Sequence, residues 1–243
     1  ILSSATIALK IIENGKETIF GFSGDIGRPN RPILKDPEKM PLCDYLICES
    51  TYGGEKHKDN ITTDDYFLKI INETCVERRG RVIIPAFSVG RTQEIVFTLD
   101  KLKGQGKIGE IPVFVDSPLA VNATEVFKLH PECYDNEMHE YLRKEGDPFG
   151  FNSLHYVSEL EQSKELNEMD SPAIIISASG MAQAGRVKHH IFHNIENPNC
   201  TILMVGYCAD GTLGEKLIKK PSQIKIFGEL LNVNARIETL SSM

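Results

Sequence analysis

The first third of the chain is rich in stretches with the pattern of β-strands. The stretch 5–12 is strand-like, and Glu13-Asn14-Gly15-Lys16 supplies an Asn-Gly turn. A second strand-like stretch, 17–22, follows at once, so the pattern predicts a β-hairpin. A further short strand is expected over 45–48, after a connector that contains several prolines.

From about residue 60 the pattern changes to short apolar runs that alternate with segments of helical periodicity. Helices are expected over 64–79, 90–102, 122–129 and 186–194, and buried strands over 81–85, 113–115, 173–176 and 201–205. Continuous Val/Ile runs between helices are typical of a parallel sheet covered on both faces. The tail returns to a β pattern over 223–227 and 232–240, with a turn at Gly228-Glu229.

The expected fold class is therefore α/β, a doubly wound and mostly parallel sheet with flanking β-strands. The order is β-rich, then α/β, then β-rich, which an inserted domain would produce. With 243 residues and 41% hydrophobic content, the chain is long enough to bury a sizeable core. It contains no apolar run near 18 residues, so the sequence predicts no membrane span and no membrane partner.

Charge and cysteine usage narrow the function classes only slightly. The net charge of −7 argues mildly against indiscriminate nucleic-acid binding, although a local basic groove stays compatible with it. The six cysteines are scattered without a C-x-x-C pair, and several lie in apolar runs. We interpret them as buried, reduced thiols of a cytoplasmic protein.

Two carboxylates follow strands in the first part of the chain. Asp25 comes after Ser23-Gly24, where glycine lets the backbone turn and the carboxylate project beyond a sheet edge. That position suits a metal ligand, but a residue that caps its own loop is the commoner outcome. Glu49 precedes a Ser-Thr-Tyr-Gly turn, where it could orient a histidine or act as a base, or simply stabilise the turn.

Six ordered motifs resemble the β-CASP family of metallo-β-lactamase-fold RNA nucleases, which includes the cleavage and polyadenylation endonucleases. The motifs span nearly the whole chain, and their order carries more weight than any one of them. They are Gly21–Arg28, Glu49–Gly53, Ile84–Glu94, Asp116–Ala120, Ser177–Met181 and Gly206–Gly214.

The resemblance implies a zinc-dependent ribonuclease that holds two zinc ions and acts on single-stranded RNA. It implies that Asp25 bridges the two metals and that Glu49 orients a catalytic histidine, so both are candidate catalytic residues. It places a partial metallo-β-lactamase domain at 1–53, the β-CASP domain at 54–241 and the return to the first domain at 242–243. A homodimer is a possible assembly that the sequence leaves undecided.

The same resemblance implies that most metal ligands of the family are absent from this sequence. No His-x-His-x-Asp-His run occurs, and the seven histidines do not replace it. We therefore expect this chain to lack nuclease activity by itself. A non-catalytic RNA-contact or subunit-interaction module of a pseudoenzyme is the main alternative, and a generic nucleotide-binding α/β domain is a third hypothesis.

Two loops of the α/β region are candidates for substrate contact. Ser88 and Arg91 lie between a strand and a helix, and Ser179 and Arg186 occupy the corresponding place after a later strand. Hydroxyls, a guanidinium and backbone N–H groups at a helix start suit a phosphate oxygen, although ordinary capping would explain the same residues. His189 and His193 are one helical turn apart, and we interpret them as part of a half-exposed helix face rather than as metal ligands.

Overall fold

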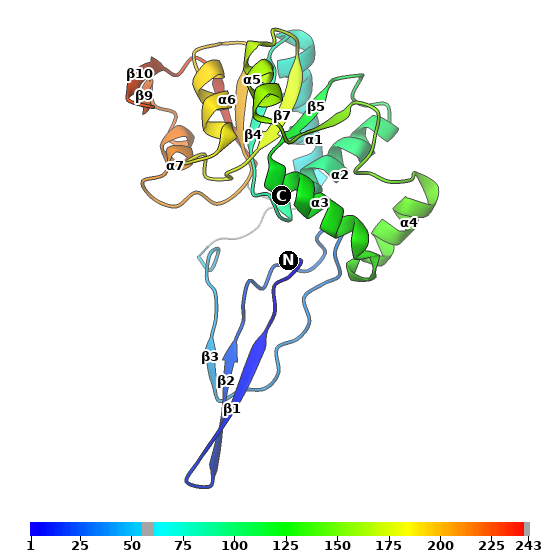
Figure 1. Cartoon of the computed structure of the whole chain (residues 1–243), viewed down its shortest axis with the longest axis vertical. Helices are drawn as coiled ribbons and strands as arrows, with labels where there is room; N and C mark the ends of the chain where they lie inside the picture. The colour runs from blue at the N-terminus through cyan, green and yellow to red at the C-terminus, as the bar shows by residue number, and fades with distance from the viewer. Residues whose placement is uncertain (55–60, 241–243) are drawn as a thin grey trace. The chain divides into compact units, whose positions relative to one another are not determined.

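The computed structural model describes residues 1–54 and 61–240, which group into two compact units (Figure 1). The first unit consists of residues 1–54 together with 130–144. The second consists of residues 61–129 and 145–240. Within the described residues, no helix is long and apolar enough to cross a membrane.

The first unit is built on a three-stranded sheet. Strands β1 (Ile7–Glu13) and β2 (Lys16–Phe22) pair antiparallel, and β3 (Tyr45–Ile47) pairs parallel to β2. Asn14 and Gly15 both have positive φ, 49° and 76°, as a two-residue hairpin turn requires. The hairpin that the Asn-Gly pair predicts is therefore confirmed.

The segment 130–144 packs with the connector of the first unit. It contains a 3₁₀-helix, η2 (Pro131–Cys133), and helix α4 (Asn136–Lys144). The Lys35 N–H donates to the Cys133 carbonyl (2.9 Å), and Leu34 forms a β-bridge with Tyr134. The predicted domain bounds 1–53, 54–241 and 242–243 stay predictions, and 241–243 lie outside the described residues.

The second unit contains a six-stranded sheet in which every strand is parallel to its neighbours. The order across the sheet is β11-β8-β4-β7-β5-β6. In chain order the strands are β4 (Arg81–Pro85), β5 (Val113–Asp116), β6 (Leu154–Val157), β7 (Ala173–Ser177), β8 (Thr201–Met204) and β11 (Arg236–Thr239). The predicted α/β class with a parallel sheet is confirmed.

Helices cover both faces of this sheet (Figure 1). The core on one face joins Ile83, Ile175 and Ile202 to α5 (Leu160–Glu168), α6 (Arg186–Asn194) and α7 (Leu213–Ile218). The other face is covered by α1 (Ile61–Ile71), α2 (Arg91–Gly104) and α3 (Pro118–Leu129). This division follows from right-handed crossovers, because the chain runs across the sheet in opposite directions before and after β6.

Three segments differ from the sequence expectation. The helix expected over 64–79 becomes π-helical over Asn72–Glu77 (η1), and edge strand β6 was not predicted. The stretch expected as one strand over 232–240 divides between two sheets. β9 (Gln223–Ile226) and β10 (Glu229–Asn232) form an antiparallel hairpin, whereas β11 joins the parallel sheet beside β8.

The cysteines are all free, but only Cys75 and Cys200 are buried. Cys43, Cys133 and Cys208 are partly buried, and Cys48 is exposed. The expectation that the thiols are generally buried is therefore wrong. Cys48 follows β3, whose three residues are all exposed, so an apolar run there does not imply burial.

Candidate functional site at the carboxyl ends of the parallel strands

Four loops leave the carboxyl ends of the central strands and gather at one edge of the sheet. We call them the edge loops: 86–90 after β4, the single residue Ser117 after β5, 178–185 after β7 and 205–212 after β8. In open parallel sheets this edge is where ligands bind, above all where the connections reverse direction. Here the reversal lies between the adjacent strands β4 and β7.

The edge loops contact one another. The Ser88 and Ser117 hydroxyl oxygens are 3.3 Å apart, which joins the first loop to the second. The Ala86 N–H donates to the Ser177 carbonyl (3.0 Å), and the Gly214 N–H donates to the Met181 carbonyl (2.9 Å). These contacts join the loop after β4 to the loop after β5 and to the end of β7, and they join the loop after β7 to the start of α7.

The start of α2 satisfies its own polar groups. The Gly90 N–H donates to the Gln93 side-chain oxygen (2.7 Å), and the Thr92 hydroxyl donates to the Phe87 carbonyl (2.8 Å). Arg91 pairs with Glu94 at 2.9 Å, and both of these side chains are only 12% exposed. The donors that the sequence offers to a phosphate are thus engaged within the chain, and phosphate contact by Ser88 and Arg91 stays a prediction.

Asp116, at the end of β5, is the centre of a buried polar cluster. Its side chain is fully buried, and one carboxylate oxygen accepts from Arg186 Nη1 (2.7 Å). The other oxygen accepts from the Ser163 hydroxyl (2.6 Å) and lies 2.6 Å from His190 Nε2. Burial alone would raise the pKa of Asp116, but the hydrogen bonds from His190, Ser163 and Arg186 together hold it below its ordinary value.

Arg186 uses both terminal nitrogens of its guanidinium in this cluster. Besides Asp116 it donates to the carbonyls of Val157 (3.2 Å) and Ser158 (2.7 Å), so it ties the start of α6 to the ends of β5 and β6. Ser179 is engaged locally, because its hydroxyl donates to the Ala184 carbonyl (3.2 Å). The structure thus gives both predicted substrate residues a positioning role, and their contact with substrate stays a prediction.

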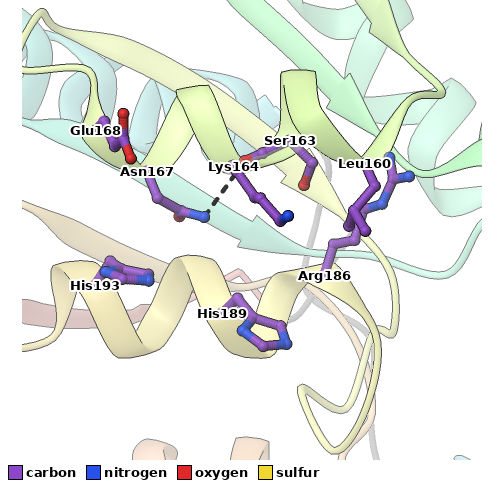
Figure 2. Close-up of a pocket in the computed structure, with 8 residues that line it drawn as sticks. All are labelled: Leu160, Ser163, Lys164, Asn167, Glu168, Arg186, His189 and His193. Atoms are coloured by element: carbon purple, nitrogen blue, oxygen red, sulfur yellow. Dashed lines mark hydrogen bonds between the residues drawn. The ribbon is translucent and has the colours of Figure 1, made fainter.

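A shallow pocket of about 270 Å³ lies between α5 and α6 (Figure 2). His189 and His193 line it from α6, and Lys164, Asn167 and Glu168 line it from α5. Burial, and then the nearby His189 and His190, lower the pKa of His193. Among the described residues no group of three or more His, Cys, Asp or Glu side chains is placed to hold a metal, here or elsewhere.

Asp25 and Glu49 lie together at the end of the first unit's sheet. The Ser23 N–H donates to the Ile47 carbonyl (3.0 Å), and the Glu49 N–H donates to the Ser23 hydroxyl (3.0 Å), so Ser23 joins β2 to β3. Gly24 has φ +60°, and a Cβ there would stand 2.6 Å from the Ala5 carbonyl oxygen. Only glycine fits this turn, which leads directly to the exposed Asp25.

The Glu49 carboxylate accepts a hydrogen bond from the Thr51 N–H (2.9 Å). This bond, with the Thr51 hydroxyl and the Ile26 N–H, lowers the pKa of Glu49. The hydrogen bond from the Ile26 N–H means that the Glu49 carboxylate lies beside Ile26, the residue that follows Asp25. The structure thus brings the two predicted catalytic residues to one place.

The described residues do not fit a complete zinc site. A zinc ion takes about four ligands from His, Cys, Asp or Glu, and a binuclear centre takes more. Asp25 and Glu49 provide two carboxylates, and among the described residues they belong to no group of three or more His, Cys, Asp or Glu side chains that could hold a metal.

Comparison with known proteins identifies the family. The Beta-Casp domain model matches residues 92–217, more than half of the chain, and this range carries three of the four edge loops entire. Ribonuclease TTHA0252 of Thermus thermophilus is 31% identical over 230 residues, which are 95% of this chain and 53% of the relative.

Two further relatives come from archaea. An RNase J-like protein of Methanocaldococcus jannaschii is 30% identical over 240 residues, 98% of this chain and 54% of the relative. The transcription termination factor FttA of Methanosarcina mazei is 30% identical over 228 residues, 90% of this chain and 36% of the factor. The chain thus spans about half of the length of these curated relatives, or less. From the matched domain and these relatives, the chain belongs to the β-CASP family.

Proposed function

We propose that this chain is part of a zinc-dependent nuclease that hydrolyses phosphodiester bonds of single-stranded RNA. The observation that carries the proposal is the placement of Asp25 and Glu49 side by side, through Ser23, at the ends of adjacent strands. Two relatives carry the names ribonuclease and RNase J-like protein, and a third is named a transcription termination factor.

Each carboxylate has a role in this proposal. Asp25 is exposed at a turn fixed by Gly24, so its carboxylate is accessible to a ligand from solvent. Glu49 has a lowered pKa, which keeps it ionised as a hydrogen-bond acceptor for a histidine. Zinc, when bound with ligands beyond those described here, would supply a Lewis acid and activate water.

The test is cleavage of a fluorescently labelled single-stranded RNA by the full native protein loaded with zinc. We expect Asp25→Ala to lower the cleavage rate by at least about 100-fold and Glu49→Gln to lower it by about 10- to 100-fold. Glu38→Gln is the matched control, because Glu38 is an exposed carboxylate of the same unit. Its rate should equal that of the unsubstituted protein.

Two results would contradict the proposal. One is the absence of RNA cleavage by the zinc-loaded native protein under any of the metal concentrations tested. The other is cleavage that persists unchanged in Asp25→Ala, since the activity would then come from another site or from a contaminant.

A further inference from the structure

The outward surface of the edge loops is apolar and partly aromatic. The exposed fractions are 43% for Phe87, 41% for Val89, 64% for Leu119 and 40% for Tyr207. Phe87, Val89 and Tyr207 come from the loops after the adjacent strands β4 and β8, and Leu119 lies in the first turn of α3, after β5. Exposed apolar side chains that gather in this way mark a binding surface more often than chance exposure does.

Phe87 packs closely against the loop that follows β7. A Cβ added at Gly180 would stand 2.7 Å from Phe87 Cδ2 and 2.8 Å from Cε2, so the ring rests directly on the glycine backbone. One side of the ring is thereby fixed, while a substantial part of its surface stays in solvent. A ring held in this way is a rigid platform for a flat partner.

The Tyr207 loop continues this surface. A Cβ added at Gly214 would stand 2.6 Å from Cys208 Sγ and 2.9 Å from the Met181 carbonyl oxygen. Gly214, in the first turn of α7, therefore lies between Cys208 of the loop after β8 and Met181 of the loop after β7. Phe87 and Tyr207 belong to the loops that follow the adjacent strands β4 and β8.

The polar side chains of the same region point inward. Arg186 is held by Asp116 and two carbonyls, Arg91 by Glu94, and the Ser88 hydroxyl is within reach of Ser117. The net charge of −7 also limits long-range attraction of a polyanion to this chain. A nucleic acid at this edge would therefore find rings and aliphatic groups rather than free cations.

We propose that Phe87 and Tyr207 form a stacking platform for the bases of single-stranded RNA at the carboxyl edge of the parallel sheet. Stacking is tolerant of sequence because every base has a π-face, and unpaired bases can be splayed out to reach such a ring. The proposal rests on the proposed function for the identity of its ligand, but it assigns the contact to residues other than Ser88, Arg91, Ser179 and Arg186.

The test is binding of single-stranded RNA by the full native protein in an Asp25→Ala background, followed by fluorescence anisotropy. We expect Phe87→Ala and Tyr207→Ala each to raise Kd by about 10-fold, the size of one lost base–aromatic stack. Phe227→Ala is the matched control, because Phe227 is an aromatic of 47% exposure in the β9–β10 turn, outside the edge loops. Its Kd should not change.

An RNA of the same length with abasic positions separates stacking from phosphate contact. It keeps every phosphate but has no base to stack, so the unsubstituted protein and the two alanine variants should bind it equally. Phe87→Leu keeps an apolar side chain and should bind base-containing RNA as weakly as Phe87→Ala. Tyr207→Phe keeps the ring and should bind normally. Thermal melting checks that each variant is folded.

Three outcomes would contradict the proposed stacking platform. The first is an unchanged Kd in folded Phe87→Leu and Tyr207→Ala. The second is an equal loss of affinity for abasic RNA. The third is a change in assembly size on light scattering without a change in Kd, which would mean that a protein surface covers these residues. Base-dependent binding without cleavage by the native protein would instead contradict the proposed nuclease function and leave the platform standing.

Discussion

Strands β1 and β7 are both rich in apolar residues, yet the residues of β1 are exposed and those of β7 are buried. All seven residues of β1 are exposed, among them Ile7, Leu9, Ile11 and Ile12, whereas all five residues of β7 are buried. β7 lies between two parallel strands with helices on both faces, while β1 is the edge of a three-stranded sheet without a covering layer among the described residues. An apolar strand pattern thus specifies the strand, and the connections that follow it decide whether it becomes core.

Polar interactions are likewise exposed in the first unit and buried in the second. In the first unit, the Lys10–Glu17 pair on the hairpin is about half exposed at both side chains. In the second, Asp116 and His190 are completely buried and hydrogen-bonded to each other. Exposed pairs contribute little to stability, but a buried group that loses its partner is strongly destabilising.

The largest expected effect is on the Asp116 cluster. Asp116→Ala leaves Arg186 and His190 without their carboxylate, so we expect the free energy of unfolding of the second unit to fall by about 3–5 kcal/mol. Urea unfolding of the 243-residue chain, followed by circular dichroism, measures it. The control, Glu17→Ala, removes an exposed pair and should cost less than about 1 kcal/mol. Equal losses in the two variants would contradict the contrast between the units.

A smaller effect is expected from apolar truncation in the two sheets. Ile175→Ala empties fully buried volume in β7, and the expected loss of stability is about 2–5 kcal/mol. Leu9→Ala in β1 removes a side chain that is 49% exposed, and the expected change is within about 0.5 kcal/mol. The same urea experiment measures both. A loss above about 2 kcal/mol in Leu9→Ala would mean that β1 is covered in solution.

The smallest expected effect is a difference in the rate at which the cysteines are labelled under native conditions. Cys48 is exposed, whereas Cys75 and Cys200 are buried, and burial raises the pKa of Cys75 to about 12. Because the thiolate is the reactive form, iodoacetamide should modify Cys48 first and should reach Cys75 and Cys200 only after unfolding. Peptide mass spectrometry at timed intervals checks the order. Early modification of Cys75 would show that the second unit opens readily.

The sequence predicts local elements well where one pattern governs them. The bounds of β4 and α6 agree with the expected Arg81–Pro85 and Arg186–Asn194, because short Val/Ile runs and helical periodicity are local signals. β11 and β10 were merged into one strand, since the choice between a hairpin and the parallel sheet depends on pairing with β8. β6 was missed because an edge strand that contains His155 and Tyr156 lacks a continuous apolar run.

In the candidate site too, local features could be predicted from the sequence and long-range contacts could not. The loops that carry Ser88 and Ser179 were located correctly after buried strands, but the partners of their polar groups within the chain were not predicted. Arg186 donates to Asp116, and Asp116 also contacts Ser163 and His190, which lie 47 and 74 positions beyond Asp116 in the chain. An aspartate that closes a buried strand was visible in the Asp116–Ala120 motif, but the motif did not reveal its partners.

The strand order has a consequence for biosynthesis. β4 leaves the ribosome before the other strands of its sheet, yet its neighbours are β7 and β8. Translation at roughly 5–20 residues per second reaches β7 some ninety residues later, so the nascent β4 waits roughly 5–20 s for a neighbouring strand. During that interval α1 and α2 can cover only one of its faces. The apolar strand Val82-Ile83-Ile84 is therefore exposed to aggregation, and open to protection by chaperones, while the chain is being made.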